Sequence, residues 1–152
     1  MRVDTIGYEG ATPQGFIAAL KEAGIALLVD VRAVAMSRRP GFAKTRLAAN
    51  LAEAGIEYVH LRGLGTPADG RAAARSGRHD EMHRIFREHM TTDVAQTDLA
   101  TLVSIIEGGR RVCLMCFERD PEHCHRSLVI EALAARLPIE ASHLFAEDAG
   151  PD

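Results

Sequence analysis

The chain has 152 residues, of which 47% are hydrophobic, and this length favours one compact domain over two. Eighteen basic and twenty-one acidic residues give a formal charge of −3, which excludes a strong general attraction of polyanions and leaves only a local patch for any nucleic-acid contact. The N-terminus lacks a signal-like apolar region and no run of about 18 apolar residues occurs, so we expect a cytoplasmic protein without a membrane segment. Its three cysteines are then expected to be reduced.

Short apolar runs rich in β-branched residues alternate with amphipathic helical patterns along the whole chain. This alternation predicts a single three-layer α/β domain over residues 1–146, with a mostly parallel sheet of four or five strands and helices on both faces. We expect residues 147–152 to be a frayed tail. Strands are predicted over residues 2–6, 26–31, 57–61 and 111–117, with a weaker edge strand over 141–145.

Helix signals fall between these strands. Thr12 followed by Pro13 predicts an N-cap and a first helical residue, and Gly24 predicts the end of that helix. Further helices are predicted over residues 43–54, from about residue 79 to 90, and over 94–107. Between them, five glycines and prolines predict a long loop over residues 63–77, either functional or a surface excursion.

A last helix is predicted to begin inside the stretch CFERDPEHCHRS, residues 116–127. Asp120 is placed to be its N-cap and Pro121 its first residue. Cys124 would then lie in the first turns, where the helix dipole and nearby arginines favour a thiolate. The alternative is a small buried hydrophobe on the packed face of the helix.

The carboxyl ends of the predicted strands carry most of the candidate chemistry. Ligands bind beyond this edge of open parallel sheets, because loops and helix N-termini converge there. The sequence therefore predicts a functional cleft at this edge. The residues that follow the strands are Gly7, Tyr8 and Glu9, then Asp30, Arg32, Arg38 and Arg39, then His60 and Arg62, and then Cys116, Glu118 and Arg119.

A metal site is a second interpretation of the cysteine-rich stretch. Cys116, His123, Cys124 and His125 are suitable ligand types, but positions 124 and 125 of a helix point about 100° apart, which argues against one shared ion. Cys116, Cys124 and His125 remain possible ligands, and no cofactor is assigned. His79 and His83 lie one helical turn apart and could also bind metal, but the neighbouring charged residues favour a solvated helix start.

Other short motifs match this sequence by spacing alone, and their predicted structural surroundings do not fit the function of the motif. Cys113 and Cys116 match CxxC by spacing, but in a strand these positions face opposite sides of the sheet. Cys113 and Arg119 match Cys-x5-Arg, yet the intervening residues are too bulky for an anion cradle. No phosphate-binding P-loop or dinucleotide-binding glycine motif occurs in a strand-to-helix context.

Several ordered motifs together resemble one family. They are TIGYEG at residues 5–10, LLVDVR at 27–32, SRRPGF at 37–42, YVHLRGLGTP at 58–67 and C-x-E-x2-P-x2-CHR at 116–126. In combination they resemble the bacterial family called domain of unknown function 488. The resemblance places Asp30, Arg32, His60, Gly65, Cys116, Glu118, Cys124, His125 and Arg126 at signature positions. Family members often carry His-Ser where this chain has Tyr8-Glu9, so the resemblance assigns no catalytic role there.

The leading hypothesis from the sequence is an enzyme that acts on an anionic small molecule or nucleotide, although the residues leave enzymatic activity undecided. Cys116 would be the nucleophile or a metal ligand, Glu118 or His60 the general base, and Asp30 would orient Arg32. The anion-binding residues would be Arg32, Arg39, Arg126, Gly7, Tyr8 and Gly65.

Three alternatives stay open at this point. Asp30, Arg32, Glu118 and Arg126 could form a structural ion-pair network. A nucleic-acid-binding module could use the basic residues Arg62, Arg71, Arg75 and Arg78. A structural zinc site is the third alternative. The oligomeric state is not indicated by the sequence.

Overall fold

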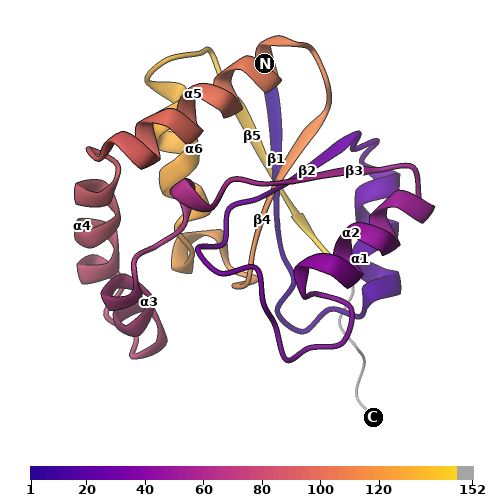
Figure 1. Cartoon of the computed structure of the whole chain (residues 1–152), viewed down its shortest axis with the longest axis horizontal. Helices are drawn as coiled ribbons and strands as arrows, with labels where there is room; N and C mark the ends of the chain where they lie inside the picture. Colours follow the sequence, from indigo (N-terminus) through magenta and orange to yellow (C-terminus); the bar gives the residue numbers. More distant parts are fainter. Residues whose placement is uncertain (147–152) are drawn as a thin grey trace.

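The computed structural model describes residues 1–146 and contains one five-stranded, all-parallel sheet with strand order β3-β2-β4-β1-β5 (Figure 1). This arrangement confirms the predicted α/β class and the position of the last strand at an edge of the sheet. All five predicted strands are present, and each end lies within one residue of its predicted position. They are β1 (Arg2–Gly7), β2 (Leu27–Asp30), β3 (Glu57–His60), β4 (Val112–Cys116) and β5 (Glu140–Phe145).

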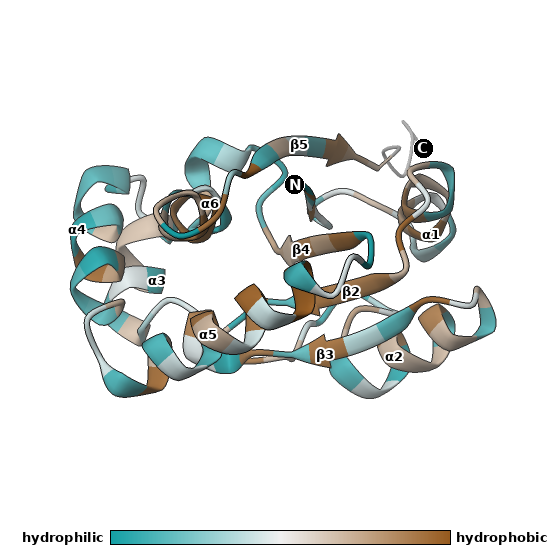
Figure 2. Cartoon of the chain, turned by 90° about the horizontal axis from the view of Figure 1, so that it is seen from above, coloured by the Kyte–Doolittle hydropathy of each residue, from teal (hydrophilic) through white to brown (hydrophobic). Residues whose placement is uncertain are grey.

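Helices cover both faces of the sheet, as Figure 2 shows from above. One apolar core packs α1 and α2 against one face, and a second core packs α3, α4, α5 and α6 against the other. Within residues 1–146, no helix is both long enough and apolar enough to cross a membrane. The helices are α1 (Pro13–Glu22), α2 (Lys44–Glu53), α3 (Ala68–Arg75), α4 (His79–His89), α5 (Asp93–Glu107) and α6 (Arg126–Ala134), with short 3-10 turns η1 (Arg62–Leu64) and η2 (Pro121–His123).

Local signals in the sequence explain where the first helix begins and ends. The Thr12 side chain accepts a hydrogen bond of 3.0 Å from the backbone N–H of Gly15, as an N-cap should, and Pro13 is the first helical residue. After the helix, Gly24 has a φ of +72°, which a residue with a side chain rarely adopts. The chain then enters β2, which is buried along its whole length.

Side chains along β4 alternate between the two faces of the sheet. Cys113 and Met115 lie in the core under α1 and α2, whereas Leu114 and Cys116 lie in the core under α3 to α6. Cys113 and Cys116 therefore face opposite sides of the sheet, which confirms that their CxxC spacing is accidental.

The prediction of a loop over residues 63–77 is wrong. Residues 62–64 form η1 and residues 68–75 form the helix α3. The alanine-rich sequence ADGRAAAR has enough helix propensity to tolerate one internal glycine. Gly70 itself packs closely, because a Cβ atom there would lie 2.4 Å from Thr66 Cγ2 and 3.2 Å from Ile85 Cγ2.

The predicted start of the last helix also needs correction. Asp120 does cap a helical turn, accepting a hydrogen bond of 2.9 Å from the Glu122 N–H, but this turn is the short η2. Cys124 follows it in an extended conformation, with φ −122° and ψ 150°, and α6 begins only at Arg126. Cys124 therefore lies in a link between two helical segments and not on a helix.

Candidate functional site

A cleft of about 710 Å³ lies at the carboxyl edge of the sheet. Segments that follow β1, β2 and β4 line it, together with residues of α3, α4 and η2. The cleft therefore lies where the sequence predicts one, beyond the strand ends. Among the predicted site residues, those in its lining are Tyr8, Arg32, Cys116, Glu118, Cys124 and His125.

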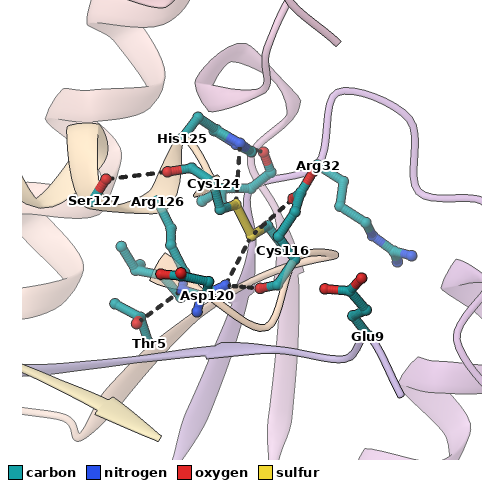
Figure 3. Close-up of a disulfide and its surroundings, with 12 residues drawn as sticks. Thr5, Glu9, Arg32, Cys116, Asp120, Cys124, His125, Arg126 and Ser127 are labelled. Atoms are coloured by element: carbon teal, nitrogen blue, oxygen red, sulfur yellow. Dashed lines mark hydrogen bonds between the residues drawn. A yellow bond between two sulfur atoms is a disulfide. The ribbon is translucent and has the colours of Figure 1, made fainter. Parts of the chain in front are cut away.

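A disulfide between Cys116 and Cys124 lies in the lining of this cleft (Figure 3). Cys116 ends β4, and the chain returns through η2 so that the extended Cys124 meets it. The sequence predicts reduced thiols for all three cysteines, so this bond corrects the prediction for two of them. Both cysteines are buried, with 1% and 0% of their surface exposed, and Cys113 is free and buried on the other face of the sheet.

The Arg126 guanidinium organises the turn after β4. It is fully buried, and its Nη1 donates to the Glu118 carbonyl and lies 3.2 Å from Cys116 Sγ. Its other donors reach Thr5 Oγ1 at 3.1 Å and the Arg119 carbonyl at 2.9 Å. Burial lowers the pKa of Arg126 to about 10, which leaves it charged at neutral pH.

His125 lies beside the disulfide with a defined ring orientation. Its Nε2 is 2.7 Å from the Val31 carbonyl oxygen, which can only accept, so Nε2 carries the proton. Its Nδ1 consequently presents a lone pair to Cys124 Sγ, 3.6 Å away. Burial lowers the pKa of His125 to about 4, and the ring is neutral at physiological pH.

These side chains form a group that could hold a metal ion once the disulfide is reduced. Cys116 Sγ, Cys124 Sγ and a ring nitrogen of His125 lie within 4.8 Å of one another. The expectation that Cys124 and His125 point apart is wrong for this pair, because Cys124 is extended and not helical. Thiolate and imidazole ligands suit zinc and similar transition metals.

Glu118 supplies a carboxyl group next to the sulfurs. Its Oε2 lies 3.9 Å from Cys116 Sγ, and its side chain lines the cleft. Burial, followed by the charge of nearby Glu9, raises the pKa of Glu118 above its usual value. A carboxyl group in this position can act as a proton donor or acceptor for chemistry at the neighbouring sulfur.

Asp30 and Arg32 form a buried ion pair, of which Arg32 lines the cleft. Arg32 Nε and Nη2 donate to the two carboxylate oxygens at 2.9 and 2.7 Å, and Tyr58 Oη donates to Asp30 at 2.6 Å. Arg32 Nη1 reaches the Phe42 carbonyl at 2.7 Å. Burial opposes the charge of Arg32, but the hydrogen bonds and charge of Asp30 outweigh it and raise the pKa of Arg32.

His60 and Arg39 lie outside the cleft lining. His60 Nε2 donates to the Arg32 carbonyl at 2.6 Å, so this ring nitrogen supports the segment after β2. Arg39 Nη2 donates to the Ala11 carbonyl at 2.5 Å, while its Nε is buried with no hydrogen-bond partner among the described residues. The structure thus does not bring these two predicted site residues to the cleft.

The two predicted site glycines allow close approach of the backbone. A Cβ atom at Gly7 would lie 1.7 Å from the Glu118 carbonyl oxygen, and one at Gly65 would lie 2.2 Å from the Ala33 nitrogen. Tyr8 does line the cleft, and its ring stacks on Phe42 with ring centroids 4.7 Å apart. Glycine at position 7 is needed because the turn after β4 crosses directly over it.

Four basic residues of the cleft lining were not placed at the carboxyl edge of the sheet from the sequence, although one of them, His123, was considered as a metal ligand. Arg71 and Arg75 come from α3, His79 from the start of α4 and His123 from η2, and the two imidazole rings stack with centroids 4.3 Å apart. The two arginines lie one turn apart on α3, a spacing that would have placed them on one helix face had this helix been predicted.

The basic residues considered for nucleic-acid binding do not all share this surface. Arg71 and Arg75 line the cleft, whereas Arg62 and Arg78 do not. Arg78 pairs with Glu81 through a hydrogen bond of 2.6 Å.

The fold and the site define a parallel α/β protein with a cysteine-, histidine- and glutamate-lined cleft at the carboxyl edge of its sheet. The chain belongs to the family described as Domain of unknown function DUF488, whose model matches residues 12–133. A comparison with curated proteins gives no match.

Proposed function

We propose that the protein is an enzyme that acts on an anionic small molecule or nucleotide in this cleft. One observation carries the proposal: the cleft combines groups suited to covalent or acid–base chemistry with cationic groups on a neighbouring wall. Cys116 and Glu118 supply the first set, and Arg71 and Arg75 supply the second. Functional sites often combine such groups within one concave surface.

The charge in the cleft differs in sign from that of the whole chain. Three arginines and two glutamates line the cleft, whereas the chain carries a formal charge of −3. Arg75 is exposed, and Arg71 uses one donor for the Thr66 carbonyl at 2.9 Å and keeps others for a ligand. An anion would therefore find its binding groups inside the cleft and repulsion over much of the remaining surface.

The buried arginines take a different role in this proposal. Arg32 and Arg126 direct their guanidinium donors to protein acceptors, so we assign them to positioning of the site. Arg126 holds the turn that carries Cys116 and Glu118. In the reduced protein, Cys116 is either the nucleophile or a metal ligand, and Glu118 is the group that accepts or donates the proton.

Isothermal titration with inorganic phosphate, pyrophosphate and adenosine monophosphate tests the anion site. We expect at least one of these probes to bind with one site per chain. Arg75→Gln should weaken that binding about tenfold or more, because a hydrogen bond to a charged group contributes about 1.5–3 kcal/mol. The matched control is Arg46→Gln, which removes the same charge from an exposed position on α2.

Two results would contradict the proposal. Absence of binding by all three probes would remove the anion site. Equal weakening by Arg75→Gln and Arg46→Gln would show a general charge effect and no built site. If a probe or a related anion is turned over, Glu118→Gln should lower kcat and leave KM nearly unchanged, because it keeps the shape of the cleft and removes the acid–base group.

A further inference from the structure

We propose that, when Cys116 and Cys124 are reduced, these thiolates and His125 Nδ1 bind one zinc ion whose fourth coordination position opens into the cleft. Glu118 would be the proton carrier for a water molecule at that position. The inference rests on the proposed function, since it names the chemistry of the same cleft: hydrolytic attack by activated water on an anionic substrate.

The spacing of Cys124 Sγ and His125 Nδ1 suits a tetrahedral metal, and reduction of the disulfide frees Cys116 Sγ to join them. Zinc–sulfur bonds of about 2.3 Å and zinc–nitrogen bonds of about 2.0–2.1 Å require ligand atoms about 3.5–3.8 Å apart. Cys124 Sγ and His125 Nδ1 are already 3.6 Å apart, and all three ligand atoms lie within 4.8 Å of one another. The Cα atoms of the two cysteines are 7.2 Å apart, beyond the usual 4.4–6.8 Å of disulfides, so the backbone leaves room for the sulfurs to separate once the bond is reduced.

Outer contacts already orient these ligands as in known metal sites. A metal-binding histidine commonly donates its second ring N–H to a carbonyl or carboxylate, and His125 Nε2 donates to the Val31 carbonyl. This contact directs the free Nδ1 toward Cys124. Arg126 Nη1, 3.2 Å from Cys116 Sγ, would stabilise that sulfur as a thiolate.

The number of ligands distinguishes a catalytic site from a structural one. Structural zinc sites have four protein ligands, whereas catalytic sites have three and keep one position for water or substrate. Among residues 1–146 the group contains Cys116, Cys124 and His125 only, and all three line the 710 Å³ cleft. The remaining position is thus available to the cleft.

Glu118 follows Cys116 by two residues, the spacing at which a general base follows a metal ligand in another class of zinc enzymes. Zinc deaminases use a His-x-Glu or Cys-x-Glu arrangement, in which the first residue binds the metal and the glutamate moves protons without binding it. Cys116-Phe117-Glu118 has the same spacing, and Glu118 Oε2 lies 3.9 Å from Cys116 Sγ. The comparison concerns the local site and not the fold.

The proposed reaction balances as a hydrolysis. Glu118 takes one proton from the bound water, the water oxygen forms a bond to the electrophilic atom of the substrate, and the bond to the leaving group breaks. Glu118 then returns the proton to the leaving group, so that one water molecule is consumed. The disulfide is the oxidised, metal-free form: a dithiol reductant supplies two electrons and two protons to open it, and metal binding displaces both thiol protons.

Cobalt(II) titration of the full chain tests the metal site. The protein is reduced with an excess of dithiothreitol, freed of reductant under nitrogen, and titrated while the thiolate-to-cobalt charge-transfer band is recorded. We expect one equivalent of cobalt, displaced by one equivalent of zinc, and no band in the oxidised protein. Cys116→Ser and Cys124→Ser should each weaken binding at least 100-fold. Cys113→Ser is the matched control and should bind normally, because Cys113 faces the other side of the sheet.

A second measurement needs no variant. Zinc should slow alkylation of Cys116 and Cys124 by iodoacetamide in the native reduced chain, as read by mass spectrometry of the peptides.

A variant separates metal binding from catalysis. Glu118→Gln should keep the cobalt band while abolishing any hydrolytic turnover. Absence of stoichiometric binding, or equal loss in Cys113→Ser and Cys116→Ser, would overturn the inference.

The two proposals fail separately. Phosphate binding that depends on Arg75 but occurs without any metal site would leave the anion cleft and remove the zinc centre. A cobalt band that needs both cysteines, in a protein that binds no anion, would leave the metal site and remove the proposed function.

Discussion

Replacement of Arg32 by methionine tests whether the Asp30–Arg32 pair is structural. The substitution keeps most of the apolar stem of the side chain and removes the guanidinium. Asp30 would lose its contacts with Nε and Nη2, at 2.9 and 2.7 Å, and the Phe42 carbonyl would lose its contact with Nη1. Asp30 would retain the hydroxyl of Tyr58 and the backbone N–H of residue 32.

The expected loss is large because Asp30 is fully buried and Arg32 is 6% exposed. Removing one partner of a buried ion pair costs about 3–5 kcal/mol, since the other charge remains in a poorly solvated place. For a chain of this size, each kcal/mol lowers Tm by about 2–4 °C, so the expected fall is about 6–20 °C. The exposed pair Arg78–Glu81 provides the control, and Arg78→Met should cost less than about 1 kcal/mol.

Urea unfolding followed by circular dichroism measures these losses. The double variant Asp30→Asn/Arg32→Met should recover part of the stability, because it removes the unpaired buried charge. A loss below about 1 kcal/mol in Arg32→Met would refute the reasoning. Unchanged stability combined with weaker phosphate binding would instead make Arg32 a ligand-binding residue, as the sequence predicted.

Two further substitutions test the surroundings of the Arg126 guanidinium. Gly7→Ala should lower the free energy of unfolding by at least about 3 kcal/mol, because its Cβ would lie 1.7 Å from the Glu118 carbonyl oxygen. Gly108→Ala is the control: its Cβ would have its nearest contact at 3.2 Å, and the free energy of unfolding should change by less than about 1 kcal/mol. The pKa of His143 is lowered in the folded chain, first by burial and then by the charge of Arg126. As pH falls below about 6.5, this histidine therefore takes up a proton in the unfolded chain before it does so in the folded chain. The free energy of unfolding should fall over this pH range. His143→Gln should make this fall less steep, with the contribution of His125 remaining, and an unaltered profile would show that His143 does not contribute.

The sheet and most helices could be predicted because their signals are local. Buried parallel strands such as β2 appear as short apolar runs, and the run LLVD is buried at every position. Thr12 with Pro13 and a glycine at position 24 mark helix ends that depend on nearby backbone geometry alone. The carboxyl edge of the sheet, and with it the location of the cleft, then follows from the parallel topology.

The composition of the site could be predicted only in part, because it depends on the path of the chain between elements. Asp120 and Pro121 mark a helical turn correctly, but they do not show that the turn ends before Cys124. That difference decides whether Cys124 and His125 diverge or converge. In the same way, glycines that favour a loop by composition are tolerated in α3, because Gly70 packs against Thr66 and Ile85.

The buried polar groups explain why this edge of the sheet is better understood as a site than as part of the core. Apolar residues of similar volume often stabilise a fold as well as a buried ion pair does, so stability alone does not account for Asp30, Arg32, His125 and Arg126. Each of them instead makes a directional bond near the cleft: Asp30 binds Arg32, Arg32 the Phe42 carbonyl, His125 the Val31 carbonyl, and Arg126 the turn of Glu118 and Arg119. The contacts of Arg126 and His125 restrict the positions of Cys116, Cys124 and Glu118 relative to one another. Such restriction is what a reactive or metal-binding group requires and what an apolar core, which packs without directional bonds, does not provide.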